Sequence, residues 1–453
     1  MNIVRSRRLK WLLALFAALA AARAAMYLVP KLPHTRPMPF PKAPPEAVER
    51  FRDAKFGLFI HWGPASITGK EIGWSRGAER PRIGGKGDVP VEVYDNLYKA
   101  FNPTSFDARQ WVALAQSAGM RYLVFTAKHH DGFCMFDSRL TDYKVTRSPF
   151  GRDVTAELAA ACRQAGLLFG IYYSVPDWHH PDYLGPNHDR YLQYMAGQVH
   201  ELCTRYGPVD LFWFDAVPDS DSVEPLFNPH RLSLQMRRDQ PRMVINDRLD
   251  EGDFSVYEDD VVRHGLDRPW ETCMPLGKQW SYKPDDQLKS AGECIRMLVS
   301  CAGAGGNLLL GVGPIPTGQI EPRQAAILNQ IGQWTSRFGE SVFGTRKGPV
   351  EPAAWGACTR RGSRWYVHVL DWAKGPVLLR TTGYTPLRWT VLTGGTAQVK
   401  LTAAGIQVDV PQQYRQDVDT IVAIDVGKAV AARLSHRITS HDLPRADSYG
   451  NGP

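Results

Sequence analysis

Apolar runs of strand length alternate, from Phe56 onward, with segments of helical period that end in glycine. This rhythm constrains the fold more than any other feature of the sequence. The apolar runs are Phe56–Gly63, Tyr122–His130, Leu167–Ser174, Val209–Ala216, Arg242–Arg248 and Asn307–Val312. The helical segments are Phe106–Ala118, Asp153–Ala165, Tyr191–Tyr206 and Pro322–Phe338. Because the runs are largely apolar on both faces, they predict strands of a parallel sheet covered by helices.

Polar residues stand where several of these runs end, and they are His61, His129, His130, Tyr173, Asp215 and the segment Asn246–Arg248. A (β/α)8-like barrel explains this coincidence, because such barrels build their active site from the C-terminal ends of the strands. A doubly wound open sheet explains it less fully, since the sequence has no dinucleotide fingerprint or phosphate loop. The glycine-rich segment Gly303–Gly306 precedes a strand instead of following one. We therefore expect an α/β fold with a TIM-type (β/α)8-like barrel over residues 51–344.

The pattern changes beyond Gly344 to short apolar runs separated by turns, which predicts a C-terminal antiparallel β-sandwich over residues 345–430. The expected strands are Trp365–Leu370, Val377–Arg380, Trp389–Leu392, Gly405–Val410 and Thr420–Ile424. Residues 431–453 are polar and without pattern, so they predict a flexible tail.

The N-terminal segment has the features of a secretory signal. Five basic residues and no acid occur in residues 1–25, and the apolar run Trp11–Ala22 is followed by small residues that suit a signal peptidase. We expect a signal peptide over 1–25, a Pro-rich leader over 26–50, and a secreted or periplasmic protein. An uncleaved anchor is the alternative. Because the run is shorter than the roughly 20 residues that cross a bilayer, we expect no membrane span in the mature chain.

Charge and cysteine usage exclude several classes of function. The formal charge of +8 falls to +3 without the five basic residues of the signal, so nucleic acid is not an expected partner. The seven cysteines stand singly with no C-x-x-C pair, which predicts neither a zinc site nor a dense disulfide framework. In a chain long enough to build its own core, we expect buried free thiols.

Two groups of strand-end residues are candidates for chemistry. Asp215 ends a wholly apolar run, where a carboxylate is costly unless it faces a polar cavity. Capping of the following turn is the alternative. His129 and His130 are adjacent, so on a strand they point to opposite faces and are not expected to bind one metal ion. Neutral imidazoles can instead donate to and accept from hydroxyl groups, with core packing as the alternative.

Later segments supply a second carboxylate and the aromatic side chains. The candidate acids are Glu258, Asp259, Asp260 and Glu271, although runs of acids are commonly solvated loops. The tryptophans suited to stacking on a sugar ring are Trp62, Trp74, Trp178, Trp213, Trp270 and Trp280, with core packing as the alternative for each. Two acids, strand-end histidines, an arginine and several tryptophans in one barrel mouth indicate a glycosidase. They do not specify the sugar.

A set of motifs, in their order along the chain, resembles a known enzyme family and thereby indicates the sugar. The motifs are His61–Gly63, Ala127–Cys134, Ser148–Asp153, Tyr172–Ser174, Trp213–Asp215, Trp270–Cys273 and Gly306–Leu310. With them the chain resembles the α-L-fucosidases of glycoside hydrolase family 29, from about Phe51 to Gly344. The resemblance implies a retaining exo-α-L-fucosidase that needs no metal or other cofactor and acts on fucosylated oligosaccharides or glycoconjugates.

The same resemblance implies roles for individual residues. Asp215 matches the nucleophile, and Glu258 is the best match for the acid/base, with Glu271 as the second choice. The residues implied to hold the sugar are His61, Trp74, His129, His130, Tyr173, Trp213, Arg248 and Glu271. A catalytically silent fucose-binding protein and a barrel glycosidase for another sugar, such as galactose, are the alternatives.

One departure from the family pattern concerns linkage. Many members carry an acid directly before the tryptophan of the first long loop, where this sequence has Gly73. The segment Gly73–Arg76, with Pro90–Asn96 after it, resembles the branch that prefers α-1,3- and α-1,4-linked fucose. Glu71 is a candidate to take over the contact of the missing acid.

Overall fold

A closed barrel of eight parallel strands forms the larger part of the molecule. The computed structural model describes residues 40–81, 83–215, 227, 229–260 and 268–428. The strands are β1 (Phe56–Ile60), β2 (Tyr122–Lys128), β3 (Leu168–Ser174), β4 (Leu211–Asp215), β5 (Val244–Ile245), β6 (Ser255–Glu258), β7 (Trp270–Pro275) and β8 (Asn307–Val312). They pair in the order β5-β4-β3-β2-β1-β8-β7-β6. A parallel bridge between Asn246 and Phe254 joins the two ends of this order, so the sheet closes. The expected TIM-type fold is confirmed.

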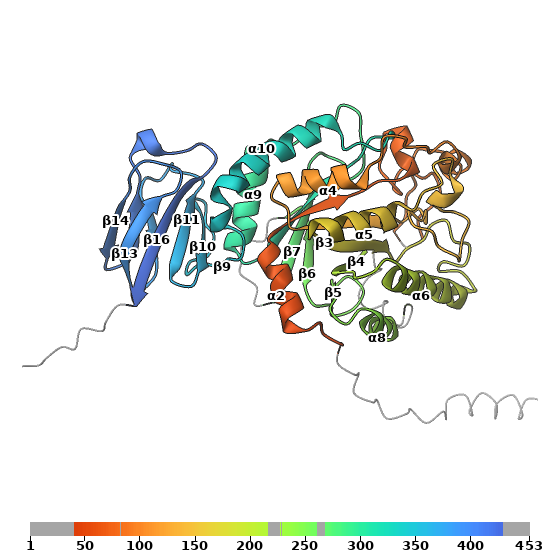
Figure 1. Ribbon diagram of the computed structural model, residues 1–453, viewed down its shortest axis with the longest axis horizontal. Coiled ribbons are helices and arrows are strands. Elements are labelled where there is room, and N and C mark those ends of the chain that lie inside the picture. The colour runs from red at the N-terminus through yellow and green to blue at the C-terminus, as the bar shows by residue number, and fades with distance from the viewer. Residues whose placement is uncertain (1–39, 82, 216–226, 228, 261–267, 429–453) are drawn as a thin grey trace, which may run out of the picture. The chain divides into compact units, whose positions relative to one another are not determined.

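Helices lie outside the strands (Figure 1), and they are α4 (Ala108–Ser117), α5 (Val154–Ala165), α6 (His188–Arg205), α8 (Pro229–Asp239), α9 (Ala291–Gly303) and α10 (Pro322–Phe338). Side-chain caps start several of them: the Asp107 carboxylate accepts the Arg109 amide at α4, and Ser290 and Glu293 form a capping box at α9. Residues 246–254, between β5 and β6, contain no helix. This short connection carries Arg248 to the barrel mouth.

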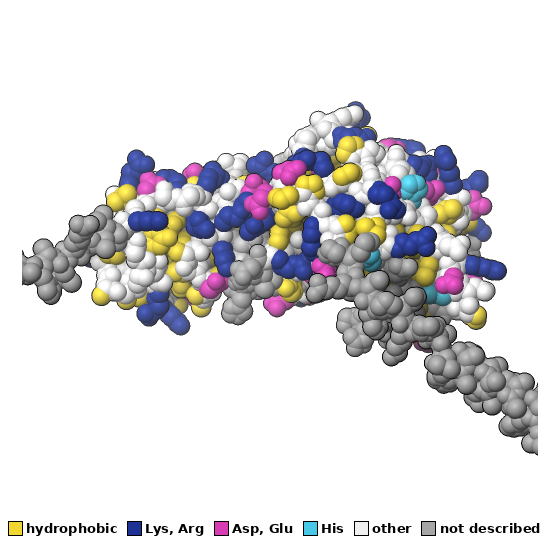
Figure 2. All heavy atoms as spheres, turned by 90° about the horizontal axis from the view of Figure 1, so that it is seen from below, with side chains coloured by type: hydrophobic (Ala, Val, Ile, Leu, Met, Phe, Trp, Pro, Cys, Tyr) yellow, Lys and Arg dark blue, Asp and Glu magenta, His cyan; other side chains and the backbone are white. Residues whose placement is uncertain are grey.

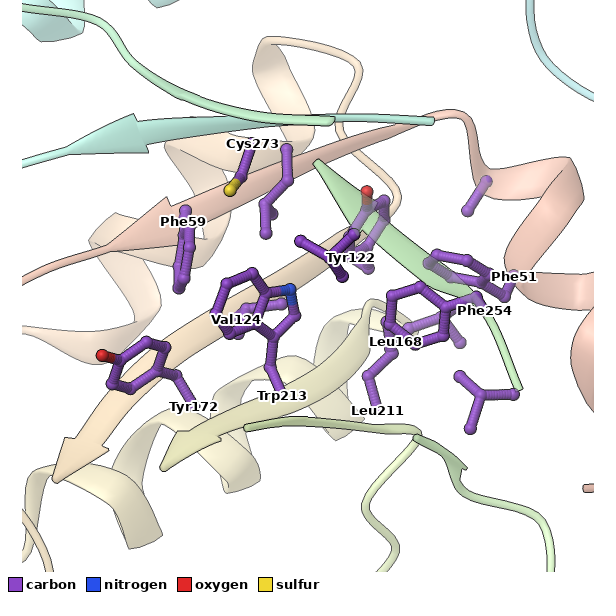
Figure 3. Close-up of a cluster of buried hydrophobic side chains, with 14 of the residues drawn as sticks. Phe51, Phe59, Tyr122, Val124, Leu168, Tyr172, Leu211, Trp213, Phe254 and Cys273 are labelled. Atoms are coloured by element: carbon purple, nitrogen blue, oxygen red, sulfur yellow. The ribbon is translucent and has the colours of Figure 1, made fainter. Parts of the chain in front are cut away.

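All eight strands contribute side chains to one apolar cluster in the barrel interior (Figure 3). The contributors are Phe59, Tyr122, Val124, Leu168, Tyr172, Leu211, Trp213, Val244, Val256, Cys273 and Leu309. Alternate residues of each strand point inward, which leaves the intervening ones to pack against the helices. The strands are therefore buried on both faces, as their apolar runs predict.

Helix α2 (Pro45–Ala54) precedes β1 and adds to the same cluster. The Phe51 ring centre lies 4.5 Å from that of Phe254 and 5.7 Å from that of Tyr122. The helix begins inside the segment expected to be a Pro-rich leader, five residues before its expected end at 50. Pro45 stands in the first turn, where a proline's missing amide costs nothing, and this signal locates the helix start.

The C-terminal segment forms two antiparallel sheets, β13-β16-β11-β10-β9 and β12-β15-β14. Their strands are β9 (Arg346–Lys347), β10 (Gly356–Arg361), β11 (Arg364–Val369), β12 (Val377–Leu379), β13 (Tyr384–Val391), β14 (Gln398–Thr402), β15 (Gly405–Asp409) and β16 (Thr420–Lys428). Both sheets contribute to one apolar cluster, which confirms the expected sandwich. The Arg296 guanidinium of α9 donates to the carbonyls of Leu370 and Asp417, so the sandwich is bonded to the barrel.

Three further observations bear on the expectations from composition. All seven cysteines are buried and free, as expected. None of the helices in the described ranges is long and apolar enough to cross a membrane. On the face in Figure 2, Lys and Arg side chains are scattered, with Asp and Glu between them. The expected signal peptide and C-terminal tail lie outside the described residues.

Candidate active site

Asp215 is the last residue of β4, and side chains from neighbouring strands surround its carboxylate. The Tyr172 hydroxyl on β3 donates a hydrogen bond to Asp215 Oδ2 over 2.6 Å. Arg248 Nη1 lies 3.5 Å from Asp215 Oδ1, and His130 Nε2 lies 3.6 Å from Asp215 Oδ2. The Asp215 side chain is 14% exposed. These contacts orient the carboxylate at the C-terminal mouth of the barrel, where the reactive groups of such barrels lie.

Glu258 is the last residue of β6, and one arginine joins it to Asp215. Arg248 Nη2 lies 3.1 Å from Glu258 Oε1, while Nη1 of the same guanidinium faces Asp215. Burial raises the pKa of Glu258 above its ordinary 4.5, the charge of Asp215 raises it further, and Arg248 opposes both effects. Glu258 therefore keeps its proton to a higher pH than an ordinary glutamate, which suits a general acid.

Three neutral histidines lie beside this carboxyl pair. Burial lowers the pKa of His61 to about 3 and that of His130 to about 4, and it lowers the pKa of His129 well below its ordinary 6.5. The ring centre of His129 lies 4.0 Å from that of His130 and 5.6 Å from that of His61. Nδ1 of His61 and Nδ1 of His129 have no hydrogen-bond partner among the described residues. Buried polar atoms are rarely unsatisfied, so these nitrogens point to a ligand with hydroxyl groups.

The structure places Glu271 away from this pair, below the site. It is fully buried on β7, where Oε1 accepts the Trp213 indole N–H over 3.0 Å and Oε2 accepts the Tyr122 hydroxyl. Burial raises the pKa of Glu271 to about 7. In the strand register Glu271 pairs with Val256, two residues before Glu258. Glu271 therefore bonds Trp213 and Tyr122 inside the barrel, one layer of side chains below Glu258.

Replacing Glu271 with Ala is expected to cost stability. The change leaves the Trp213 indole N–H and the Tyr122 hydroxyl buried without a partner and opens a cavity, which together cost about 3–5 kcal/mol. Calorimetry should therefore show a clearly lower Tm for Glu271→Ala than for Glu258→Ala, whose side chain is 38% exposed. Equal Tm values for the two variants would contradict this supporting role.

Tyr173 does not belong to the shell that the resemblance implies. Its side chain is buried outside the barrel interior, where the hydroxyl donates to Gln198 Oε1 of α6 over 2.8 Å. Its neighbour Tyr172 points inward instead, with its ring 5.5 Å from that of His129 and nearly parallel to it at 7°. Successive residues of a strand point to opposite faces, so the prediction of Tyr173 was wrong by one residue.

The two tyrosines offer a matched test of this correction. Tyr172→Phe removes a hydrogen bond to a charged carboxylate, worth about 1.5–3 kcal/mol, so kcat is expected to fall about 10- to 100-fold. Tyr173→Phe removes a hydrogen bond to a neutral amide, and it should lower stability by about 1 kcal/mol while leaving kcat near the wild-type value. Steady-state kinetics of both variants measures the difference. A larger loss of kcat in Tyr173→Phe would restore the original assignment.

The predicted tryptophans divide between the site and the core. Trp74 stands edge-on to His130, with ring centres 5.4 Å apart, and edge-on to Trp178 at 5.2 Å. Trp213 is 1% exposed and lies under Arg248, whose guanidinium carbon is 5.6 Å from the indole ring centre. Trp280 packs against His61 with ring centres 5.0 Å apart. Trp62 and Trp270 are buried core residues, outside this group.

Gly73 occupies a position that no larger residue could fill without moving the site. Its φ is +68°, and a Cβ there would lie 2.7 Å from His129 Nδ1. The Gly73 amide donates to the Tyr94 hydroxyl over 2.7 Å. Glu71 does not replace an acid at this point, because its carboxylate accepts the backbone amides of Ile72, Trp280 and Ser281.

Sequence reasoning missed three residues of the site. Tyr172 lies level with Trp213 in the parallel register and shares its inward direction, which only the structure shows. Ser174 Oγ lies 2.6 Å from His130 Nδ1 and fixes that ring. Arg80 comes from a loop without any strand or helix pattern, and its guanidinium carbon lies 5.0 Å from the Trp74 ring centre. No sequence signal pointed to Arg80.

The chemistry available here is that of a carboxyl pair facing a sugar. Among the described residues no group of three or more His, Cys, Asp or Glu is arranged to hold a metal ion. Arg248 contacts both Asp215 and Glu258, so the two carboxyls face the same guanidinium, as a pair of acids in a glycosidase can. The neutral histidines supply hydrogen bonds for hydroxyls beside that pair.

Comparisons with known proteins agree with this geometry. The family model described as Alpha-L-fucosidase matches residues 41–340. The tissue alpha-L-fucosidase of Macaca fascicularis is 30% identical over 402 residues, covering 81% of this chain and 84% of the relative. The structure of alpha-L-fucosidase isoenzyme 1 from Paenibacillus thiaminolyticus is 33% identical with a TM-score of 0.75, covering 84% of this chain and 99% of that one.

A further similar structure captures a step of a reaction. It is that of an alpha-L-fucosidase from Bacteroides thetaiotaomicron, a trapped covalent intermediate in complex with 2-fluoro-fucosyl fluoride. Its sequence is 28% identical to this chain, and its TM-score is 0.76. The alignment covers 85% of this chain and 97% of that one.

Proposed function

Because the chain belongs to the alpha-L-fucosidase family of glycoside hydrolases, we propose that it removes terminal α-L-fucose from glycans with retention of anomeric configuration. The observation that carries this proposal is the guanidinium of Arg248 between the carboxylates of Asp215 and Glu258. The covalent intermediate of the Bacteroides thetaiotaomicron relative supports the retaining course.

In the first step Asp215 attacks C1 of the fucose ring and the glycosidic C–O bond breaks. Glu258 gives its proton to the departing oxygen, so the leaving group departs as an alcohol. The product on the enzyme is a β-fucosyl ester of Asp215. The hydrogen bond from Tyr172 and the charge of Arg248 hold the attacking carboxylate in place.

In the second step the role of Glu258 reverses. Esterification removes the charge of Asp215, which had raised the pKa of Glu258, so that glutamate loses its proton more easily and can act as a base. It takes a proton from water, and the resulting oxygen attacks C1 and releases Asp215. Two inversions at C1 give α-L-fucose, the configuration of the substrate.

The raised pKa of Glu258 has a consequence for pH dependence. Since the first step needs the protonated form, kcat/KM should fall as pH rises through the pKa of Glu258, which lies above 4.5. Wild-type kcat/KM measured across pH with an aryl α-L-fucoside should show this alkaline limb. The pH profile of Glu258→Ala should lack this alkaline limb. If the limb persists in that variant, a group other than Glu258 causes it.

The finer proposal is that α-1,3- and α-1,4-linked fucose is the preferred substrate. Its support is an ion pair that joins the two segments, Gly73–Arg76 and Pro90–Asn96, that resemble the α-1,3/1,4 branch. Arg76 binds Asp95 through two hydrogen bonds of 2.6 and 2.7 Å, and its Nη1 donates to the Trp178 carbonyl. This buried pair anchors the Gly73–Arg76 segment against the segment that carries Asp95, and so fixes Trp74 at the rim.

A substrate panel tests the reaction and the linkage together. Branched oligosaccharides with α-1,3- or α-1,4-linked fucose should be hydrolysed with higher kcat/KM than α-1,2-linked ones, and the corresponding α-galactosides should not be hydrolysed. Release of galactose in preference to fucose would replace the proposed sugar. Binding of fucose without hydrolysis of any substrate would instead indicate a silent binding protein.

We also propose that the protein is exported and loses residues 1–25. The support is in the sequence alone, in the basic start and the apolar run Trp11–Ala22. Intact mass of the protein recovered from a secreting host would give the mature N-terminus. A mass that includes residue 1 would favour the uncleaved anchor.

A further inference from the structure

A cavity of about 780 Å³ lies beside the candidate active site, and Trp74 lines it. The Trp74 ring stands edge-on to His130, which in turn lies 3.6 Å from Asp215. Trp74 is therefore the wall between the carboxyl pair and this cavity. An exo-acting enzyme encloses only the terminal sugar, so the remainder of a glycan must leave the site across its rim. A cavity of this size can hold such a portion of the ligand.

The charged side chains of this cavity are predominantly basic. Four cations line it, namely Lys70, Arg80, Lys86 and Lys283, against the two acids Glu71 and Asp88. Lys70 is paired with Asp88. The remaining three cations have no carboxylate within ion-pair distance in the described part of the chain.

Glu71 is bonded to the backbone and not to a cation of the cavity. Its carboxylate accepts three backbone amides, from Ile72, Trp280 and Ser281. Even with the charges of Glu71 and Asp88 counted in full, the four cations leave the cavity lining net positive.

Arg80 is fixed in place while part of its guanidinium stays unused. Nη2 donates to the Trp74 carbonyl over 2.6 Å, and the guanidinium carbon lies 5.0 Å from the Trp74 ring centre and 5.6 Å from that of Trp178. Its Nε is buried without a hydrogen-bond partner among the described residues. Arg80 also lines the cavity, and a guanidinium held in one orientation is suited to bind an oxyanion.

We propose that this cavity binds an anionic group, a sulfate ester or a carboxylate, on the part of the glycan beyond the fucose. The inference rests on the proposed fucosidase function and names the class of its natural substrate: an acidic fucosylated glycan. Arg80 binds the oxyanion from the side of Trp74, Lys86 adds positive charge from the same loop, and Lys283 adds it from the loop at 279–284.

The test compares three substrates that share an α-1,3-fucosylated N-acetyllactosamine core: the neutral trisaccharide, the trisaccharide sulfated on its galactose, and the tetrasaccharide that carries sialic acid on that galactose. An aryl α-L-fucoside is measured beside them. At low salt, the wild type should hydrolyse at least one acidic substrate with kcat/KM about 5- to 10-fold above that of the neutral one. The preference should fall towards 1 at high salt, because exposed charge interactions are screened.

Substitution locates the effect. In Lys86→Met/Lys283→Met the ratio of acidic to neutral kcat/KM should fall, and because it is a ratio within one variant it does not depend on the fraction folded. Lys400→Met, on β14 of the sandwich, is the matched control and should keep the wild-type ratio. Preference for the sulfated or for the sialylated substrate alone identifies which anion the cavity takes.

Two results separate this inference from the proposed function. Hydrolysis of the aryl fucoside and the neutral glycan with no preference for either acidic one would overturn the acidic substrate class and leave the fucosidase intact. Failure to hydrolyse any fucoside would overturn the fucosidase. In that case calorimetry with the sulfated and the neutral trisaccharide still tests whether the cavity binds an anion. Equal affinities for the two would contradict that proposal.

Discussion

Replacing Asp215 with Asn is expected to lower kcat by at least about 10³-fold, because an amide oxygen cannot form the fucosyl ester. The substitution keeps the shape of the side chain, and Asn can still accept the Tyr172 hydrogen bond, so the barrel mouth should stay intact. Activity on an aryl α-L-fucoside measures the loss, and calorimetry with fucose checks that the sugar still binds. Full activity in this variant would remove Asp215 from the role of nucleophile.

The same strand offers a matched control. Asp210 directly precedes β4, where its carboxylate accepts the Phe169 amide and pairs with Arg50 over 3.1 Å. Asp210→Asn is the same chemical change at the opposite end of the strand. Because a partly exposed ion pair contributes little, kcat should stay within about twofold of wild type. If Asp210→Asn lost as much activity as Asp215→Asn, the loss in both variants would come from disturbance of strand β4 and not from removal of the catalytic carboxylate.

Replacing Glu258 with Ala is expected to have the second-largest effect, and the size of that effect should depend on the leaving group. A sugar alcohol needs a proton to depart, so hydrolysis of a natural glycan should fall by about 10²- to 10⁴-fold. A nitrophenolate departs without one, so the first step with its fucoside should be much less impaired. Equal losses on both substrates would contradict the acid role.

Azide distinguishes the two carboxyls by the stereochemistry of its product. In Glu258→Ala, azide should attack the fucosyl ester of Asp215 and give α-fucosyl azide with an increased rate. In Asp215→Gly it should attack the substrate directly and give β-fucosyl azide. If the α-azide forms in Glu271→Ala and not in Glu258→Ala, the acid/base is Glu271.

Much of the fold could be predicted because a buried parallel sheet leaves a strong pattern. The runs that became β2, β3 and β8 are apolar on both faces, and each is bounded by a helix cap or a glycine. Strands with little apolar surface escaped the prediction. Four of the five residues of β14 are exposed, and β9 has only two residues, so neither produces a run. Helix α2 was missed because it begins within the Pro-rich segment, and proline is rare in the interior of a helix.

Part of the candidate site could be predicted from strand ends, but side-chain direction could not. Asp215 ends an apolar run that became β4, whereas Glu258 ends β6, a short strand that left no apolar run, and only the family resemblance pointed to it. Tyr173 was chosen over Tyr172 because both stand in the same motif, and only the register with β4 shows which points inward. Glu271 also lies in a motif that resembles the family, and its side chain points into the barrel, but one layer of side chains below Glu258. Arg80 lies on an irregular loop, which no periodicity can orient.

The configuration of the first-formed sugar tests the central claim most directly. The wild-type enzyme is mixed with an aryl α-L-fucoside in an NMR tube, and the anomeric protons of free fucose are followed before mutarotation mixes the two forms. Two inversions at C1, by Asp215 and then by water, predict that α-L-fucose appears first. Initial β-L-fucose would show a single inversion, and would contradict the covalent role of Asp215.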